Sequence, residues 1–410
     1  MVQVAFVFPG QGSQYVGMGK HLLDSFSEAK YLFEEAGDTL GFDLKKLCLQ
    51  GSLNDLTRTM NAQPAILTVS MIAYRYYMSR IGISPTVAAG HSLGEYTALV
   101  TTGALSFQDG LRIVRQRGLF MEEAAHSGIG KMIAIKGLSK ERVEQICEGL
   151  TSDHMPISVA CYNTPNQIVV AGHHQVVTML TNALDRYGAS YTHLNVSGPF
   201  HSALMQPAAE KLGAVLSHYS FHELKWPVIS NVTACPYPGV GNIADGLLLQ
   251  MICPVRWEPT IRYIAQRNIK AVVELGPRTV LSKMVKEIAA KLETYSVEQE
   301  QHITNLKIRL SSTNGMDLLK QYLSAAVSTR NRNDNEQQYE MGVLTPIRQL
   351  RQWQAGLELR GEQPTLEQLK EAGKLLEHVL RSKGASAEEI QSELQAIAQA
   401  LEHARITQAI

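Results

Sequence analysis

AAGHSLGEY, residues 88–96, is the stretch that decides the fold of this chain. Residues 86–89 predict the end of a short buried strand, residues 90–94 fit the pattern G-x-S-x-G, and residues 93–101 can continue as a helix. A strand, a tight turn and a helix in this order form the context of a nucleophile elbow. The alternative interpretation is a structural turn that leads into a helix.

The two glycines of this pattern, Gly90 and Gly94, permit a sharp turn, because a side chain at either position would collide with the neighbouring element. Such a turn exposes Ser92 Oγ at the carboxyl end of a sheet. It also points the first backbone N–H groups of the helix at the charge that develops beside the serine. The stretch therefore predicts a serine nucleophile.

Composition excludes several classes of protein. Lys plus Arg equals Asp plus Glu at 38 each, which argues against a general nucleic-acid or membrane-surface binder. The five cysteines are widely spaced without a C-x-x-C pair, so we expect reduced thiols rather than a disulfide framework or a zinc site. The N-terminus lacks the features of a leader peptide, and no apolar run approaches the ~20 residues of a membrane span. We expect a soluble, cytoplasmic protein without a metal or redox cofactor.

The first part of the chain has the pattern of an α/β protein. Residues 2–8 form a continuous apolar run closed by residues 9–12 (PGQG), which predicts a strand buried in a parallel sheet. The glycine loop would place backbone N–H groups at the sheet edge where open α/β sheets bind ligands, although a plain β–α turn is the alternative. Gln63-Pro64 predicts the start of a helix through about residue 79, and residues 271–275 predict another buried strand.

Residues 128–197 change character and predict the element order βαββαβ, which is the ferredoxin-like signature. We expect this segment to be an inserted subdomain that walls one side of a cleft, between the catalytic portions 1–127 and 198–290. The expected fold class is therefore α/β. It comprises a large α/β-hydrolase-like domain with a parallel sheet and a nucleophile elbow, the ferredoxin-like subdomain, and a helical C-terminal extension.

Residues 291–410 are expected to form a linker and that helical extension. The polar residues 330–338 indicate a linker or an exposed loop, and Thr345-Pro346 predicts a helix start. Two capping boxes open two further amphipathic helices: Thr365 with Gln368, and Ser386 with Glu389. Their apolar faces repeat at helical spacing through Leu369, Leu376, Val379, Ile390, Leu394, Ile397 and Leu401. We interpret this extension as a packing or partner surface rather than a chemical site.

A serine hydroxyl is a weak nucleophile at neutral pH and needs a base. His201 is the candidate because it lies in a loop between Gly198-Pro199 and the following helix, although a lone histidine can also be structural. His91 belongs to the elbow itself. The helix predicted from Ser106 to Ala125 carries three arginines, of which we expect at least two on a solvated face: Arg112, Arg115 and Arg117.

Six short motifs are spread over residues 1 to about 290: Phe8-Pro9-Gly10-Gln11-Gly12-Ser13-Gln14, Gln63-Pro64, Gly90-His91-Ser92-Leu93-Gly94-Glu95, Arg117-Gly118, Gly198-Pro199-Phe200-His201-Ser202 and Glu274-Leu275-Gly276-Pro277. In this order and spacing they resemble malonyl-CoA:acyl carrier protein transacylases, and also the acyltransferase domains of polyketide synthases. Each motif is weak alone, but the joint match is specific.

The resemblance implies roles for the main site residues. Ser92 would attack the thioester of malonyl-CoA, and His201 would take its proton and later activate the phosphopantetheine thiol of a carrier protein. The backbone N–H groups of Gln11 and Leu93 would form the oxyanion hole. Arg117 would hold the free malonyl carboxylate in a bidentate pair that a lysine could not imitate.

The resemblance also implies the surroundings of the site. Gln63 would line the pocket, and His91 is placed with Gln63 and Phe200 among the substrate-binding residues. The ring of Phe200 would crowd the α-methyl of methylmalonyl, a preference of only about 1–3 kcal/mol. A backbone carbonyl near Gln250 would orient His201, so that no catalytic acid behind the histidine is needed.

The C-terminal extension resembles that of free-standing acyltransferases that serve polyketide synthases in trans. The expected partners are malonyl-CoA and the acyl carrier protein domains of a polyketide synthase, with neither nucleic acid nor membrane. Alternatives are a housekeeping fatty-acid malonyl transacylase and an acyl hydrolase that clears stalled chains from carrier proteins. Arg117 argues against the hydrolase. A docking or scaffold module with a vestigial site is a further alternative, which the complete set of Ser92, His201 and Gln11 disfavours.

Overall fold

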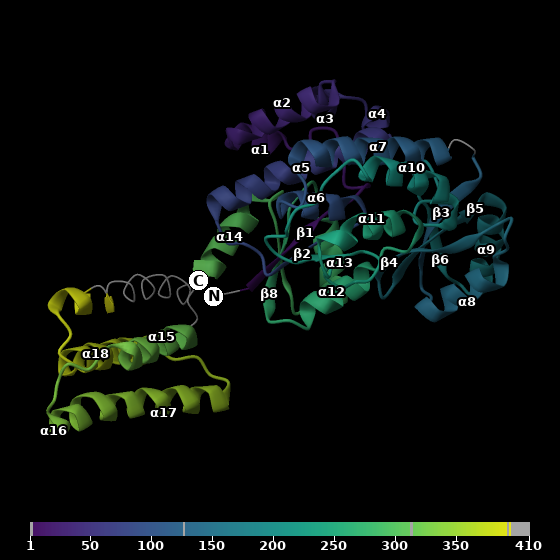
Figure 1. Ribbon diagram of the computed structural model, residues 1–410. Coiled ribbons are helices and arrows are strands. Elements are labelled where there is room, and N and C mark those ends of the chain that lie inside the picture. Colours follow the sequence, from purple (N-terminus) through teal and green to yellow (C-terminus); the bar gives the residue numbers. More distant parts are fainter. Residues whose placement is uncertain (1–2, 126–127, 312–314, 392, 395–410) are drawn as a thin grey trace. The chain divides into compact units, whose positions relative to one another are not determined.

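The computed structural model describes residues 3–125, 128–311, 315–391 and 393–394. The chain forms two compact units (Figure 1). One unit extends to Ile303 and the other begins at Thr304. Each unit has its own core, so each is described by itself.

The first unit is organised around a five-stranded parallel sheet of order β7-β2-β1-β8-β9. Its strands are β1 (Gln3–Phe8), β2 (Val87–Gly90), β7 (Val228–Ile229), β8 (Ile269–Glu274) and β9 (Glu293–Ser296). Phe8 lies opposite Gly90 in the register of β1 and β2, and Val7 lies opposite Glu274 in the register of β1 and β8. The loops that follow these three strands therefore meet at one edge of the sheet.

Helices surround this sheet (Figure 1). They are α1 (Lys20–Ser25), α2 (Glu28–Leu40), α3 (Leu44–Gln50), α4 (Leu53–Thr57), α5 (Thr59–Arg80), α6 (Leu93–Thr101), α7 (Phe107–Ala125), η1 (Ala203–Met205), α10 (Gln206–Leu216), η2 (Val240–Asn242), α11 (Ile243–Ile252), α12 (Trp257–Ala265) and α13 (Val280–Ile288). Helix α14 (Glu300–Ser311) contains the boundary between the two units.

Helix α5 begins one turn before its predicted start at Gln63-Pro64, so Pro64 lies inside the helix. Proline has no N–H, and the carbonyl of Met60, four residues earlier, loses its helical donor. Arg115 Nη1 on α7 donates to that carbonyl over 2.7 Å. The predicted start at proline was wrong because a side chain from another helix supplies the missing hydrogen bond.

A second, antiparallel sheet of order β4-β5-β3-β6 follows in the same unit. Its elements are β3 (Gly130–Lys136), α8 (Lys140–Leu150), β4 (Ile157–Thr164), β5 (Gln167–His173), α9 (His174–Arg186) and β6 (Ser190–His193). This is the predicted βαββαβ order. The apolar faces of its strands and helices share one core that includes Ile133, Val170, Val176 and Leu180. The α/β class is confirmed.

Strand β9 was not predicted, because the α/β pattern was expected to end near residue 290. The strand pairs with β8, with Ala271 opposite Glu293. It is short, contains Glu-Thr-Tyr-Ser and lies at the edge of the sheet, so it lacks the continuous apolar run that marks a central strand. An edge strand of this kind carries little periodic signal.

The second unit is helical, with α15 (Gly315–Ser328), α16 (Glu336–Tyr339), the π-helical turn η3 (Glu340–Leu344), α17 (Thr345–Arg360) and α18 (Leu366–Ser382). Its core includes the predicted apolar positions Leu369, Leu376, Val379 and Ile390, with Leu394 packed against it. Ile347, Leu350 and Leu357 of α17 complete this core. Both predicted capping boxes are present. Ile397 and Leu401 lie outside the described residues. Helix α15 was not predicted.

All five cysteines are among the described residues, and they are free. In the described part of the chain, no group of three or more His, Cys, Asp or Glu side chains is arranged to hold a metal ion. No helix within the described ranges has the length and apolar character needed to cross a membrane.

Candidate active site

The predicted strand, turn and helix are present around Ser92. Strand β2 ends at Gly90, helix α6 begins at Leu93, and Ser92 lies between them with φ 51° and ψ −106°. A residue with a side chain rarely adopts a positive φ, and such strain costs about 1–3 kcal/mol. The surrounding structure must therefore hold the turn in this conformation.

Gly90 and Gly94 are needed because the turn packs backbone against backbone. A Cβ on Gly90 would lie 1.9 Å from the carbonyl carbon of Gly94. A Cβ on Gly94 would lie 2.0 Å from the carbonyl oxygen of Phe8, at the end of β1. Both contacts are far shorter than non-bonded atoms permit, so the collision predicted from the sequence is confirmed.

Gly94→Ala is expected to destabilise the fold by at least about 2–3 kcal/mol, because the added methyl group must push α6 away from β1. Thermal unfolding followed by circular dichroism measures this change. Gly149→Ala in α8 is the matched control, since no atom lies within 4 Å of the added Cβ. A Gly94→Ala protein with the parent melting temperature would contradict the steric argument.

Ser92 and His201 form a hydrogen-bonded pair. Ser92 Oγ lies 2.8 Å from His201 Nε2, and His201 Nδ1 lies 2.7 Å from the backbone carbonyl of Gln250. A carbonyl can only accept, so Nδ1 carries the proton and Nε2 is left to accept from the serine. Burial first, and then the positive charge of Arg117, lower the pKa of His201 to about 3. The imidazole is therefore neutral at neutral pH and can act as a base.

Arg117 is buried beside this pair. Its Nη2 donates to Ser92 Oγ over 3.1 Å and to Gln250 Oε1 over 3.0 Å, and its Nη1 donates to Gln63 Oε1 over 2.8 Å. The guanidinium carbon also lies 5.2 Å from the ring centroid of Tyr96. These contacts fix the plane of the guanidinium and leave a positive charge next to the nucleophile.

The three arginines of α7 have different surroundings. Arg112 is exposed and pairs with Asp109, as expected for a solvated face. Arg115 is half-buried and donates to the Met60 carbonyl, so the expectation that two of the three are merely solvated was wrong. The close packing of α7 against α5 accounts for the difference.

A cavity of about 210 Å³ opens at Ser92. Its walls include both proposed oxyanion-hole residues, Gln11 in the loop after β1 and Leu93 at the start of α6. The N–H of Leu93 belongs to the first turn of a helix and has no acceptor within that helix. The register of β1 and β2 brings the two loops together.

The remaining predicted residues lie around this cavity in different ways. His91 lines it, and its Nε2 lies 2.8 Å from Asn163 Oδ1. Phe200 also lines it and is buried. Gln63 is not one of the lining residues, because its side chain lies behind Arg117 and is bonded to it. Gln250 likewise reaches the site through its bonds to Arg117 and His201.

Two buried side chains next to Ser92 were not predicted to belong to the site. Asn231, in the loop after β7, accepts from the Ser92 N–H over 2.7 Å. Glu95, in the first turn of α6, accepts from Gln250 Nε2 over 2.6 Å. Glu95 stands within a quoted motif, whereas no spacing in the sequence connects Asn231 to the elbow.

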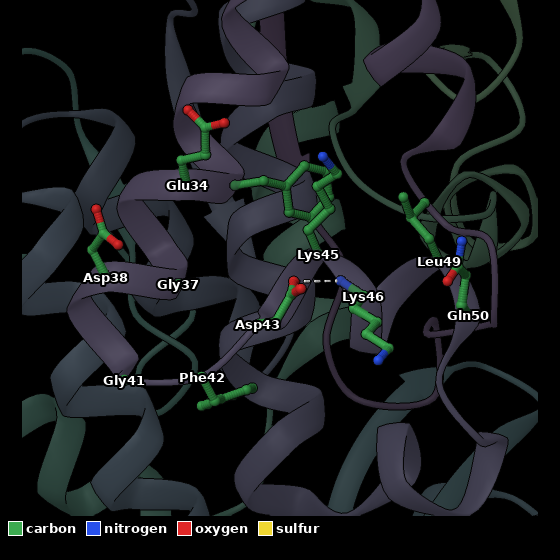
Figure 2. Close-up of a pocket in the computed structure, with 11 residues that line it drawn as sticks. Glu34, Gly37, Asp38, Gly41, Phe42, Asp43, Lys45, Lys46, Leu49 and Gln50 are labelled. Carbon is green, nitrogen blue, oxygen red and sulfur yellow. Dashed lines mark hydrogen bonds between the residues drawn. The ribbon is translucent and has the colours of Figure 1, made fainter.

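A larger hollow of about 760 Å³ lies on α2 and α3 (Figure 2). Glu34 and Asp38 lie on one side of it and Leu49 and Gln50 on the other, and the Asp43 carboxylate caps α3 by accepting from the Lys46 N–H (Figure 2). Among the described residues that line it, there is no serine, cysteine or histidine. The smaller cavity at Ser92 is therefore the candidate active site.

The matches to known proteins agree with this geometry. A family model described as acyl transferase domain matches residues 5–327. The chain belongs to this acyltransferase family, and to its malonyl-CoA:acyl carrier protein transacylases. A Bacillus subtilis malonyl CoA-acyl carrier protein transacylase is 41% identical over 360 residues, covering 85% of this chain and 88% of that protein. The Escherichia coli K12 protein of the same name is 39% identical over 300 residues, covering 73% of this chain and 97% of that protein.

Solved structures support the same assignment. The transacylase from Coxiella burnetii is 37% identical with a TM-score of 0.73, covering 76% of this chain and 98% of that chain. A malonyl-transacylase solved in complex with a type II PKS acyl-carrier protein is 36% identical with a TM-score of 0.72, covering 74% and 98%. This protein is therefore an enzyme, an acyltransferase. The Bacillus subtilis match is long enough to reach into the second unit.

Proposed function

We propose that this acyltransferase moves a malonyl group from malonyl-CoA to the phosphopantetheine thiol of an acyl carrier protein, through an ester on Ser92. The observation that carries the proposal is the position of Arg117, which donates to Oγ of a serine that is already paired with His201. A buried guanidinium beside the nucleophile suits an acyl group that ends in a carboxylate. A neutral acyl chain has no carboxylate for this guanidinium to bind, so Arg117 argues against a hydrolase of such chains.

The reaction divides into two half-reactions of the same kind. His201 accepts the Ser92 proton as Oγ attacks the thioester, and the CoA thiolate leaves with that proton. The carrier-protein thiol then gives its proton to His201 and attacks the ester, which regenerates Ser92. The N–H groups of Gln11 and Leu93 stabilise the oxyanion of each tetrahedral intermediate, by about 3 kcal/mol per donor.

The finer assignments follow from the same site. Phe200 makes malonyl preferred over methylmalonyl, His91 and Gln63 complete and support the acyl pocket, and the Gln250 carbonyl keeps His201 in the required tautomer. The domain with the parallel sheet is α/β-hydrolase-like and carries the ferredoxin-like subdomain as an insertion. Because its helical second unit resembles the extension of free-standing acyltransferases, we assign the protein a role in trans on the carrier domains of a polyketide synthase. A housekeeping role in fatty-acid synthesis is the second candidate.

Intact-protein mass spectrometry after brief mixing with malonyl-, methylmalonyl- or acetyl-CoA tests this proposal. We expect a malonyl adduct to dominate and to disappear when a carrier protein is added, with a matching gain in the carrier's mass. Rapid release of free acid from acyl-carrier thioesters, without an adduct from any of the three, would indicate the hydrolase. Comparison of carrier proteins from the two pathways distinguishes the polyketide role from the housekeeping role.

A further inference from the structure

The strained turn at Ser92 is held by side chains from distant parts of the chain. The Ser92 N–H donates to Asn231 Oδ1 over 2.7 Å, and Asn231 Nδ2 donates to the Gly90 carbonyl over 2.6 Å. A single carboxamide therefore bridges the backbone on the N-terminal side of the nucleophile. The Ser92 carbonyl in turn accepts from Gln250 Nε2 over 3.0 Å.

Glu95 holds both residues, Asn231 by its backbone N–H and Gln250 by its side-chain amide. Its Oε2 accepts from the Asn231 N–H over 3.2 Å and from Gln250 Nε2 over 2.6 Å, and its Oε1 accepts from the Tyr237 hydroxyl over 2.5 Å. Glu95 and Asn231 are buried, so these bonds are not exchanged with solvent. The orientation of the Asn231 carboxamide is determined by its partners, since Oδ1 faces a donor and Nδ2 faces an acceptor.

We propose that Asn231 is a positioning residue of this acyltransferase: its backbone N–H is held by Glu95, and its carboxamide keeps Ser92 in the strained backbone conformation from which Oγ faces His201. The inference rests on the proposed role of Ser92 as the nucleophile. Asn231 acts through the Ser92 backbone and not on the substrate. Without the bridge the turn relaxes and Oγ moves, and a displacement of about 1 Å costs about 100-fold in rate.

Asn231→Asp distinguishes this role from a general contribution to packing, because the shape is kept and one donor is lost. One carboxylate oxygen can still accept from the Ser92 N–H, but the other faces the Gly90 carbonyl, which requires a donor. The bridge therefore forms only while the new carboxyl is protonated. The titratable groups of this cluster are Glu95 on α6, Tyr237 after β7, Arg117 on α7 and His201 before η1.

Burial favours the protonated form of the new carboxyl, and Arg117 opposes it. Burial also raises the pKa of Glu95 to about 7, so the charge of Glu95 adds to the first effect only above that pH. Acylation by the Asn231→Asp protein is therefore expected to approach the wild-type rate at the acid end of the pH range and to fall as pH rises through the pKa of that carboxyl. Acylation by the Asn231→Ala protein is expected to be about 100-fold slower at every pH. The recovery of the Asn231→Asp protein at low pH does not follow from a loss of packing alone.

The experiment measures the rate of Ser92 acylation by malonyl-CoA with rapid quenching and intact mass, at pH values where circular dichroism shows each protein folded. Thr233→Ala is the matched control in the same loop, because the exposed Thr233 hydroxyl bonds the Cys235 backbone and not the elbow. It is expected to keep the wild-type pH profile. An Asn231→Asp profile parallel to that of the wild type, or wild-type rates in folded Asn231→Ala, would overturn the inference.

A second readout separates this inference from the proposed function. Phenylmethanesulfonyl fluoride sulfonylates a reactive serine without any need for malonyl-CoA, and the adduct on Ser92 is measured by mass. If the wild type reacts with this reagent but never with malonyl-CoA, the proposed function fails. The positioning role is then supported by slower sulfonylation of the Asn231 variants, with the same pH dependence, and is overturned by sulfonylation at the wild-type rate.

Discussion

The Ser92→Ala protein is expected to form no acyl-enzyme with malonyl-CoA, and its rate of transfer to a carrier protein is expected to fall by at least about 10⁴-fold. Alanine retains the Cβ and the backbone bonds of the elbow, so the fold is kept while the attacking oxygen is lost. The loss is this large because the proposed two half-reactions both pass through the same ester. Intact mass measures the adduct, and a carrier-protein gel shift measures transfer.

The position of the adduct is part of this prediction. Digestion of the acylated wild type is expected to place the malonyl group on the peptide that contains Ser92. An adduct of the same mass on the Ser92→Ala protein, or transfer at the wild-type rate without one, would show that another group carries the acyl chain. Thermal unfolding of both proteins shows whether any loss of rate reflects unfolding.

The elbow could be predicted from the sequence because its causes are local. The two glycines, the serine and the start of α6 stand within a few residues of each other, and the structure has the helix at the predicted bounds, Leu93–Thr101. The loop position of His201 made it a candidate base, but only the family resemblance gave Arg117 a role, and nothing in the spacing of either residue shows that it meets Ser92. Their geometry agrees with those roles.

The parts that the sequence did not predict depend on contacts between distant segments. Asn231 is 139 residues from Ser92 along the chain, and only the packing of the loop after β7 against the elbow brings its carboxamide there. The early start of α5 depends on Arg115, and the position of Gln63 behind Arg117 depends on the packing of α5 against α7. The pattern of apolar and polar residues in one sequence does not show which distant side chains will be in contact.

Arg117→Ala is expected to lower malonyl transfer by about 100-fold or more, because the two charge-assisted hydrogen bonds that we propose for the acyl carboxylate are lost. The same change leaves room for uncharged acyl groups, so acetyl transfer is expected to rise. Removal of the guanidinium also raises the pKa of His201, since the charge of Arg117 helps to hold that pKa at about 3. The acid limb of the activity profile therefore moves to higher pH, because a protonated imidazole cannot accept the serine proton.

The measurement for Arg117→Ala is the ratio of malonyl to acetyl transfer in one preparation. Removing a buried cation leaves Gln63 and Glu95 with fewer partners and lowers stability, but the fraction of folded protein cancels in this ratio. Arg117→Lys keeps the positive charge but not the bidentate geometry, so its ratio of malonyl to acetyl transfer is expected to lie between those of Arg117→Ala and the wild type. Arg112→Ala, on the exposed side of the same helix, should leave it unchanged. A wild-type ratio in Arg117→Ala would mean that the carboxylate is bound elsewhere, and the case for malonyl as the substrate would lose its main support.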